Sequence, residues 1–206
     1  MKFSFYRADA LYCDYLRKSD PCVPYTMDQK EARPFIGIVL TLNDYDYYAP
    51  LTSPKPKHLH MKNQVDFLKI NGGVWGAINF NNMIPIHSDQ LERIDMRLLP
   101  SDDKATVDYK NLLANQLSWC NTTANAALII QKAEKLYRII TNKTAWPQLA
   151  ERCCDFKTLE VAMTHYIERQ HTQDDPGLRS AMAKLNPVTH TQEQPVTHDE
   201  EQEWTH

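Results

Sequence analysis

Glycine is scarce in this sequence, and the short motifs that bind nucleotides or activate common hydrolases are missing. Only five of the 206 residues are glycine, which makes a backbone cradle for nucleotide phosphates an unlikely design. No G-x-x-x-x-G-K-[ST], G-x-G-x-x-G, H-E-x-x-H or G-x-S-x-G pattern occurs. Asp44 and Asp46 fit a hairpin turn, and no close group of Asp, Glu and His points to a divalent-metal nuclease. These absences argue against P-loop, dinucleotide-binding, zinc-peptidase and α/β-hydrolase chemistry.

Long apolar runs and paired cysteines are also missing. No stretch of 18 or more apolar residues occurs, so we expect no membrane span. The opening MKFSFYRADALYCDYL carries charged residues too early for the core of a signal peptide. The five cysteines show no C-x-x-C spacing, and the adjacent Cys153 and Cys154 are poorly placed to pair with each other or to form half a zinc site. We therefore expect a cytoplasmic protein with reduced thiols and no metal site.

The charge is small overall but unevenly distributed. The net charge is −3, yet residues 187–206 hold five acidic residues and no Lys or Arg. Without that segment, 23 Lys and Arg stand against 21 Asp and Glu. Within residues 53–69 a single acid, Asp66, accompanies four lysines: Lys55, Lys57, Lys62 and Lys69. A local basic patch of this kind suits a polyanion, whatever the total charge.

Strand-like stretches dominate the first half of the chain. MKFSFYR fits an opening strand, and the apolar spacing that follows predicts a helix over residues 8–20, ending before the first proline. Residues 20–34 predict an irregular loop. Two hairpins are expected, with turns at residues 43–44 and 71–73. The remaining strand candidates are 35–42, 45–51, 65–70, 74–80, 83–86 and 91–98, the last of which also fits a helix.

The second half of the chain has helical periodicity. Three helices are predicted, over residues 101–119, 122–141 and 155–171. Their expected N-caps are Ser101, Thr122 or Thr123, and Asp155. Strands followed by helices predict an α+β domain, with helices around a mostly antiparallel sheet of about six strands. We expect one domain over residues 1–185, with a helical C-terminal half. Residues 186–206 contain the tandem PVTHTQEQ and PVTHDEEQ and predict a polar, acidic, disordered tail.

A loop after the second hairpin strand concentrates groups that bind phosphate. The stretch APLTSPKPKH brings together the hydroxyls of Thr52 and Ser53, the ammonium groups of Lys55 and Lys57, and the imidazole of His58. Metal-free RNA cleavage needs an aligned 2′-hydroxyl, neutralisation of the charge on the phosphorane, and proton transfer at both ends. These side chains can supply all three. On spacing alone, an exposed polyproline-like loop or a partner-docking segment is the other interpretation.

The same region resembles a known protein family. The segments FIGIVL (35–40), YYAPLTSPKPKH (47–58) and INFNNMIPI (78–86) resemble the ToxN/AbiQ toxins of type III toxin–antitoxin systems. The opening MKF and the Y-x-x-Y-L of residues 12–16 fit as well. The resemblance covers roughly residues 1–120. It implies a strongly twisted antiparallel sheet with surrounding helices, similar to the MazF/Kid toxins.

The resemblance also implies an activity and a partner. Its members are cytoplasmic, metal-independent endoribonucleases that need no cofactor and cut A-rich mRNA to leave a 2′,3′-cyclic phosphate. A pseudoknot RNA, which the toxin itself releases from a tandem-repeat precursor, inhibits the enzyme and assembles with it into a closed protein–RNA oligomer. Several such systems defend bacteria against phage. All of these properties are expectations for this chain.

Five residues correspond to the catalytic positions that the resemblance implies. Thr52, Ser53 and Lys55 match the active-site loop, and Tyr12 matches an active-site tyrosine on the first helix. Arg33 stands where the family pattern has lysine. This departure matters, because a guanidinium holds phosphate and stabilises charge but does not act as a general base.

Four further residues complete the predicted site. Tyr25 is the nearest match to a second tyrosine, and His58 matches a histidine of the family's loop. Lys57 and Lys62 are predicted to bind RNA. The general acid and base stay unassigned between Lys55 and His58. The alternative function is a non-catalytic RNA-binding protein, inactivated by the change at position 33. A protein-docking domain that uses the proline-rich loop is a third hypothesis.

Overall fold

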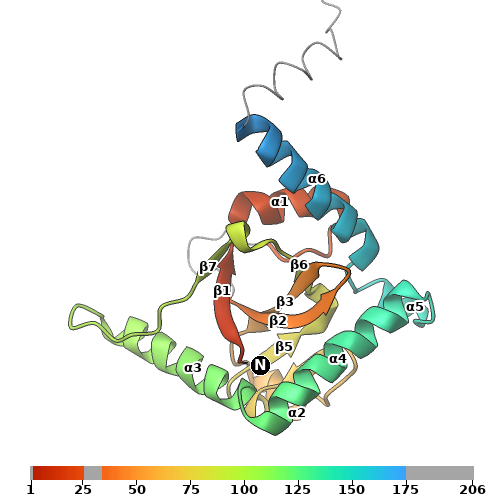
Figure 1. The fold of residues 1–206 in the computed structure, drawn as a ribbon. Helices are drawn as coiled ribbons and strands as arrows, with labels where there is room; N and C mark the ends of the chain where they lie inside the picture. The colour runs from red at the N-terminus through yellow and green to blue at the C-terminus, as the bar shows by residue number, and fades with distance from the viewer. Residues whose placement is uncertain (1, 26–33, 175–206) are drawn as a thin grey trace, which may run out of the picture. The chain divides into compact units, whose positions relative to one another are not determined.

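The fold is described from a computed structural model, whose described residues are 2–25 and 34–174. The chain divides into two compact units, residues 1–168 and 169–206. The first unit holds the sheet and the helices that surround it (Figure 1). Within the described residues, no helix combines the length and apolar character that crossing a membrane requires.

The sheet has seven strands, and every pairing in it is antiparallel. The strand order is β4-β5-β3-β2-β1-β7, and β6 pairs with β3. The strands are β1 (Ser4–Ala8), β2 (Phe35–Leu42), β3 (Tyr45–Thr52), β4 (Phe67–Lys69), β5 (Ala77–Asn79), β6 (Ile84–Pro85) and β7 (Leu91–Arg93). Asn43 and Asp44 both have positive φ, as a two-residue type I′ turn requires, so the first predicted hairpin is confirmed. The predicted α+β class is confirmed too.

Several predicted strands are shorter in the structure, including 65–70, which is a strand only at β4, and 83–86, which is a strand only at β6. The stretch 74–80 forms a strand only at β5, because the chain first turns through η1 (Asn71–Gly73) and the Ile70 N–H donates to the Gly76 carbonyl. The stretch 91–98 forms a strand only at β7. Beyond β7, the Asp95 carboxylate accepts a hydrogen bond from the Arg97 N–H at 2.9 Å. Such a local side-chain bond favours a turn over further strand pairing.

The four longer helices begin at side-chain caps, whereas the two short ones begin at a proline without such a cap. They are α1 (Ala10–Ser19), α2 (Pro56–His60), α3 (Lys104–Cys120), α4 (Thr123–Thr141), α5 (Pro147–Ala150) and α6 (Phe156–Asp174). Short 3₁₀ turns follow β5 and β6 at η2 (Phe80–Asn82) and η3 (Ser88–Gln90). Thr122 and Asp155 accept hydrogen bonds from N–H groups three residues ahead, as predicted. The prediction of Ser101 is wrong, because the Asp103 carboxylate caps α3 by accepting from the Thr106 N–H at 2.8 Å.

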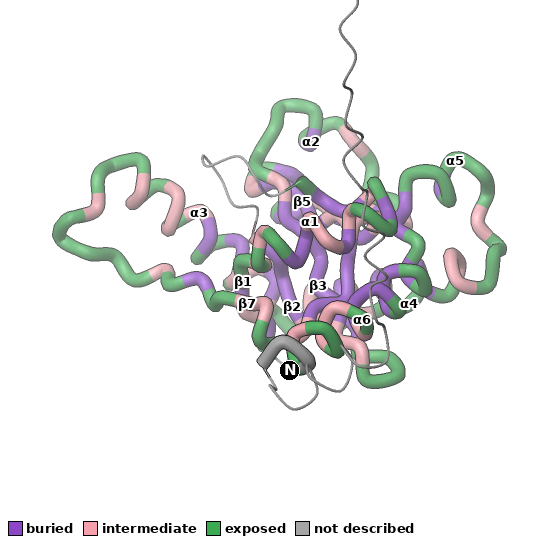
Figure 2. Tube along the Cα trace, turned by 90° about the horizontal axis from the view of Figure 1, so that it is seen from above, coloured by how far each residue is buried: buried purple, intermediate pink, exposed green. Residues whose placement is uncertain are grey.

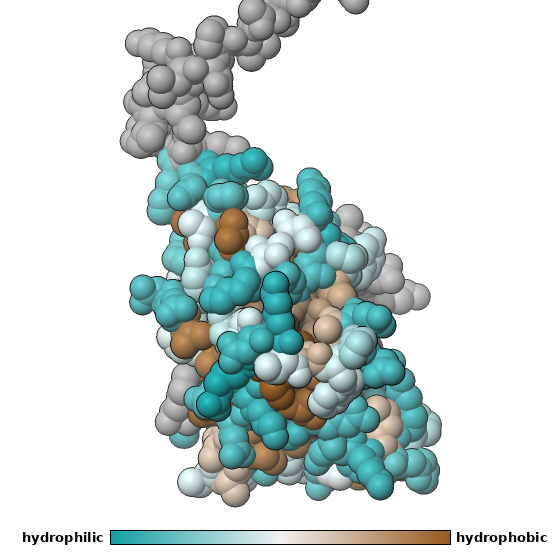
Figure 3. Space-filling model, turned by 90° about the vertical axis from the view of Figure 1, so that its right-hand side faces the viewer, coloured by the Kyte–Doolittle hydropathy of each residue, from teal (hydrophilic) through white to brown (hydrophobic). Residues whose placement is uncertain are grey.

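The core lies between the β2–β3 hairpin and the later helices. Buried residues follow the strands and the inner faces of α4 and α6 (Figure 2). Glu160 of α6 accepts hydrogen bonds from the buried hydroxyls of Tyr47 (2.8 Å) and Tyr137 (2.6 Å), which ties α6 to β3 and α4. The outer face that carries α4 and α5 is mainly hydrophilic (Figure 3).

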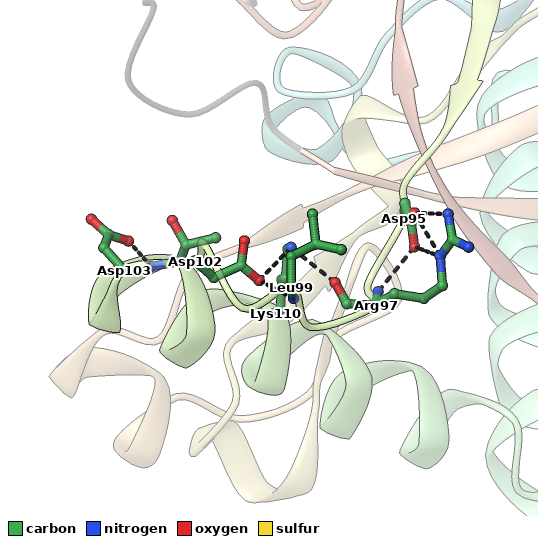
Figure 4. Close-up of polar contacts among 7 residues, drawn as sticks. Asp95, Arg97, Leu99, Asp102, Asp103 and Lys110 are labelled. Atoms are coloured by element: carbon green, nitrogen blue, oxygen red, sulfur yellow. Dashed lines mark hydrogen bonds and ion pairs between the residues drawn. The ribbon is translucent and has the colours of Figure 1, made fainter.

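Helix α3 is fastened at both ends. At its C-terminal end, the Asn121 amide exchanges two hydrogen bonds with the Phe3 backbone. Near its start, the Lys110 ammonium donates to the Asp102 carboxylate at 2.7 Å and to the Arg97 carbonyl at 2.9 Å (Figure 4). The Leu99 N–H and the Lys110 ammonium lower the pKa of the Asp102 carboxyl. This network fixes the path of the chain from β7 into α3.

Candidate active site

A cleft of about 260 Å³ opens where β3 ends. One side of it consists of Thr52, Ser53 and Lys55, which we name the hydroxyl–lysine wall. Thr52 is half-buried, whereas Ser53 and Lys55 are exposed. The three loop residues that the sequence predicted therefore line one cleft, where the Thr52 hydroxyl donates to the Ala77 carbonyl at 3.5 Å.

The opposite side of the cleft comes from α3. Tyr109, Leu112, Leu113 and Gln116 line it, and we name them the α3 wall. Their spacing of three, four and seven residues places all four on one helix face. Leu113 and Gln116 are buried, and Tyr109 and Leu112 are half-buried. The cleft thus has hydroxyl and ammonium groups from the chain at the end of β3 and aromatic, apolar and amide groups from α3, and Pro34 and Leu51 complete its lining.

The hydroxyl–lysine wall is positioned by the sheet. Thr52 pairs with Ala77 of β5, and the neighbouring Gly76 approaches the Thr52 carbonyl so closely that an added Cβ would lie 2.0 Å from its oxygen. Pro56 then starts α2, where its missing N–H costs nothing. The extended polyproline-like loop is therefore wrong, since Lys57 and His58 lie on a short helix.

Tyr12 lies away from the cleft. Its ring is fully buried, and its hydroxyl donates to the Pro85 carbonyl at 2.6 Å. Pro85 pairs with Tyr47 on β3. The five residue steps from Tyr47 to Thr52 span about 16 Å of extended strand, which separates Tyr12 from the hydroxyl–lysine wall. Burial raises the pKa of the Tyr12 hydroxyl. The predicted substrate-orienting role does not fit this position, in which Tyr12 fastens α1 to β6.

His58 is also enclosed. Its side chain is 2% exposed, its ring centroid lies 5.7 Å from that of Phe67, and it is absent from the cleft lining. Its Nδ1 has no hydrogen-bond partner among the described residues. Burial, followed by the charges of Lys57 and Lys55, lowers the pKa of His58. This position supports a packing role for the His58 ring, between α2 and Phe67, and leaves Lys55 as the acid–base candidate on the cleft.

Of the remaining predicted residues, those that the structure describes do not line the cleft. Tyr25 is 61% exposed, and the Arg17 guanidinium lies 4.8 Å from its ring centroid. Lys57 and Lys62 are exposed, and their role in RNA binding stays a prediction. Arg33 lies outside the described residues, although Pro34, the next residue, lines the cleft.

Sequence reasoning missed the α3 wall completely. The helical spacing of 109, 112, 113 and 116 was readable, but it does not reveal which part of the sheet that face meets. The contact that reveals it is long-range: the Gln116 Nε2 donates to the Trp75 carbonyl at 2.6 Å, beside the β5 residues that pair with Thr52.

A second, larger hollow offers less chemistry. It measures about 490 Å³ and lies along β7 and the segment that follows it. Two of its charged side chains, Asp95 and Arg97, bind each other through several hydrogen bonds. Among the described residues, no three His, Cys, Asp or Glu side chains are grouped to hold a metal ion. We therefore take the cleft at the end of β3 as the candidate active site.

Known proteins with this architecture have a common description. The family described as "Toxin ToxN, type III toxin-antitoxin system" matches residues 4–164. The endoribonuclease ToxN of Bacillus thuringiensis subsp. kurstaki is 30% identical over 174 residues, which cover 82% of this chain and 87% of that protein.

Two solved structures share the fold. One, from work on selective toxin inhibition by a non-coding RNA pseudoknot, superposes with a TM-score of 0.66 at 28% identity and covers 82% of this chain and 99% of its own. The other is AbiQ, a lactococcal anti-phage endoribonuclease, with a TM-score of 0.67, 26% identity and the same coverage of both chains. Because the family match spans most of the chain, this protein belongs to the ToxN family of type III toxin–antitoxin toxins.

Proposed function

We propose that this protein is an endoribonuclease toxin that cuts A-rich mRNA and its own repeat-RNA precursor in the cleft at the end of β3. The observation that carries the proposal is the meeting of Thr52, Ser53 and Lys55 opposite an aromatic and apolar helix face. A nucleotide has a matching division, because its phosphate is anionic and its base is flat and largely apolar. Membership of a family with endoribonuclease relatives supports the same activity.

The proposed reaction is a transesterification that needs no metal. The 2′-hydroxyl gives up its proton to solvent water as its oxygen attacks phosphorus, the bond to the 5′-oxygen breaks, and the products are a 2′,3′-cyclic phosphate and a 5′-hydroxyl. The Thr52 and Ser53 hydroxyls would position the phosphate, and the Lys55 ammonium would neutralise the charge that develops on it. The same ammonium would protonate the departing 5′-oxygen, since it carries three donors. Arg33 would hold phosphate rather than accept a proton.

An RNA antitoxin completes the proposed system. One structural relative comes from work on toxin inhibition by a non-coding RNA pseudoknot. For this protein we propose a pseudoknot RNA that occupies the cleft and the exposed lysines Lys57 and Lys62, in a closed protein–RNA assembly. Phage defence in the cytoplasm is the proposed biological role, as the AbiQ relative is described as an anti-phage enzyme.

Cleavage assays in excess EDTA test the proposal. The native protein should cut A-rich RNA and leave 2′,3′-cyclic phosphate ends. Lys55→Ala should lower kcat by about 10²- to 10³-fold, the usual loss for one stabiliser of transition-state charge. Ser53→Ala should cause a smaller loss. Lys104→Ala and Ser118→Ala are matched controls, because both residues are exposed on α3 and absent from the cleft lining.

Three outcomes would contradict the proposal. Cleavage that stops in EDTA and returns with Mg²⁺ would reject the metal-free reaction. Folded Ser53→Ala and Lys55→Ala proteins with full activity would reject the hydroxyl–lysine wall. Salt-sensitive binding of the repeat RNA without any cleavage would favour the non-catalytic RNA-binding alternative.

A further inference from the structure

We propose that Tyr109 is the stacking platform of the cleft, on which the base of one of the two nucleotides beside the scissile phosphate lies during cleavage. The inference rests on the proposed RNA cleavage and adds a substrate-positioning residue to the same cleft. It is argued from the place of Tyr109 in the cleft lining, the size of the cleft and the bonds that hold α3.

Tyr109 forms most of the accessible part of the α3 wall together with Leu112. Both residues are half-buried, whereas Leu113 and Gln116, on the same helix face, are buried behind them. Among the described residues that line the cleft, Tyr109 is the only aromatic one. An aromatic side chain beside phosphate-binding groups is the usual partner for the flat side of a base.

The tyrosine shares the cleft with the groups that would hold the phosphate. The cleft measures about 260 Å³, which is below the roughly 300–1,000 Å³ of sites that enclose a drug-sized ligand. It therefore has room for one base beside a phosphate and not for a run of nucleotides. Because the ribose joins a base to the phosphates on either side, a base on Tyr109 belongs to a nucleotide next to the phosphate on the hydroxyl–lysine wall.

The platform is held in place from the neighbouring position. The Lys110 ammonium donates to the Asp102 carboxylate at 2.7 Å and to the Arg97 carbonyl at 2.9 Å (Figure 4). The side chains of Lys110 and Asp102 are only 15% and 9% exposed. The Asp103 carboxylate caps the start of the same helix. A base that stacks on a helix fastened in this way orders little of the protein, so the contact can align the RNA.

Stacking complements the contacts to phosphate. A phosphate held only by hydroxyl and ammonium groups leaves the attached ribose free to rotate, whereas attack requires the 2′-oxygen, phosphorus and 5′-oxygen in line. A base fixed on Tyr109 removes much of that rotation. Stacking does not distinguish among bases, because each of them has a π face. Tyr109 is therefore expected to set the position of the nucleotide and not its identity.

Removal of a single base from the RNA tests the inference. Native protein is assayed in excess EDTA on A-rich oligoribonucleotides in which one or the other nucleotide beside the scissile bond is abasic but keeps its 2′-hydroxyl. At one of the two positions kcat/KM should fall roughly 10- to 100-fold, the usual contribution of one stacked base. Purine riboside at that position, which lacks only the amine of adenosine, should keep the native rate. In Tyr109→Leu the intact RNA should be cut as slowly as native protein cuts the abasic RNA, and removal of the base should cause no further loss.

Matched variants separate the ring from the hydroxyl and from folding. Tyr109→Phe keeps the ring and should keep the native rate and the native sensitivity to the abasic site. Trp119→Leu removes a half-buried aromatic side chain of the same helix, outside the cleft lining, and should keep that sensitivity too. Should Tyr109→Leu unfold, Tyr109→Met gives the same readout with an unbranched side chain.

Four results would overturn the inference. The first is a native rate that is unchanged by an abasic site at both positions. The second is a folded Tyr109→Leu or Tyr109→Met protein with the native sensitivity to the abasic site. The third is a loss in Tyr109→Phe as large as in Tyr109→Leu, which would assign the effect to the hydroxyl. The fourth is a loss with purine riboside as large as with the abasic site, which would assign it to the amine.

Failure of the proposed function would be visible separately. If the native protein cuts no RNA, the cleavage activity is rejected, and affinity decides the inference. A-rich oligoribonucleotides in which each nucleotide in turn is abasic are then compared with the intact RNA in Kd. A preference for the intact RNA that disappears in Tyr109→Leu supports the platform. Equal Kd values for the native protein overturn it, and so does a preference that Tyr109→Leu keeps.

Discussion

The two walls of the cleft are built in different ways. The hydroxyl–lysine wall comes from three residues within positions 52–55, at and just after the end of one strand, and two of them, Ser53 and Lys55, are exposed. The α3 wall comes from a helix more than fifty residues later in the chain, and half of its lining residues are buried. One wall is a local sequence feature and the other is a product of tertiary packing.

This difference corresponds to a division of labour in the proposed reaction. Groups that bind and neutralise phosphate need water-accessible side chains on a rigid support, which the end of β3 provides. A surface on which the flat side of a base can lie needs apolar and aromatic side chains held in place, which the packed face of α3 provides. Substitutions that affect one wall and spare the other therefore test the comparison.

The largest effect is expected where the two walls meet. Gly76 has a φ of +89°, and an added Cβ would lie 2.0 Å from the Thr52 carbonyl oxygen. Gly76→Ala should therefore displace both Thr52 and the Trp75 carbonyl that holds Gln116. We expect a loss of about 3 kcal/mol or more in the free energy of unfolding, measured in urea, together with the loss of cleavage.

Gly72→Ala is the matched control for that substitution. Gly72 also has a positive φ, +67°, but an added Cβ would have no neighbour within 4 Å. Only the backbone preference is lost, so we expect a cost of about 1 kcal/mol and unchanged cleavage. Equal losses in the two variants would show that backbone strain, and not the contact with Thr52, explains the effect at Gly76.

A smaller and more selective effect is expected in the α3 wall. Leu113 is 1% exposed and lines the cleft next to Gln116. Leu113→Ala should lower the free energy of unfolding by about 2–5 kcal/mol and, where the protein stays folded, raise KM for A-rich RNA several-fold. Leu136→Ala on α4 removes an equally buried leucine that is absent from the cleft lining. It should lower the free energy of unfolding by a similar amount and leave KM unchanged. If Leu136→Ala raises KM as much as Leu113→Ala does, general destabilisation explains the effect, and the α3 wall does not.

The same contrast explains what could be read from the sequence. The turn at Asn43-Asp44 and the caps at Thr122 and Asp155 are local patterns, and each lies where it was predicted. Thr52, Ser53 and Lys55 line one cleft, and their catalytic role stays a prediction. The expected number of strands was close to the seven observed. The further similarity to MazF/Kid toxins stays a prediction.

Long-range packing accounts for the features that local patterns did not reveal. Tyr12 has the sequence position of a site residue, but β6 pairs with β3 and places its hydroxyl against Pro85. His58 follows two lysines in an apparently solvated loop, yet α2 folds it onto Phe67. Gln116 gave no local signal, because its place in the cleft lining depends on a hydrogen bond to Trp75, a residue 41 positions earlier. Periodicity gives the face of a helix but not the surface that the face meets.

The smallest effect on cleavage is expected from a substitution of His58. It tests whether the reaction uses only the hydroxyl–lysine wall or also the buried imidazole. His58→Leu should keep kcat/KM within about threefold of native, because the ring is buried and absent from the cleft lining.

The free energy of unfolding should respond more clearly to the same substitution, through its dependence on pH. Since the pKa of folded His58 is lowered, the unfolded chain takes up a proton below about pH 6.5 that the folded protein resists. The native free energy of unfolding should therefore fall as the pH drops from 7.5 through 6.5, until it passes the lowered pKa. His58→Leu should show a shallower fall in urea titrations over this range, whereas His60→Leu, a change at the exposed neighbour, should keep the native slope. A folded His58→Leu protein with a hundredfold loss of cleavage would instead assign the imidazole to the reaction, and the acid–base role would no longer be left to Lys55.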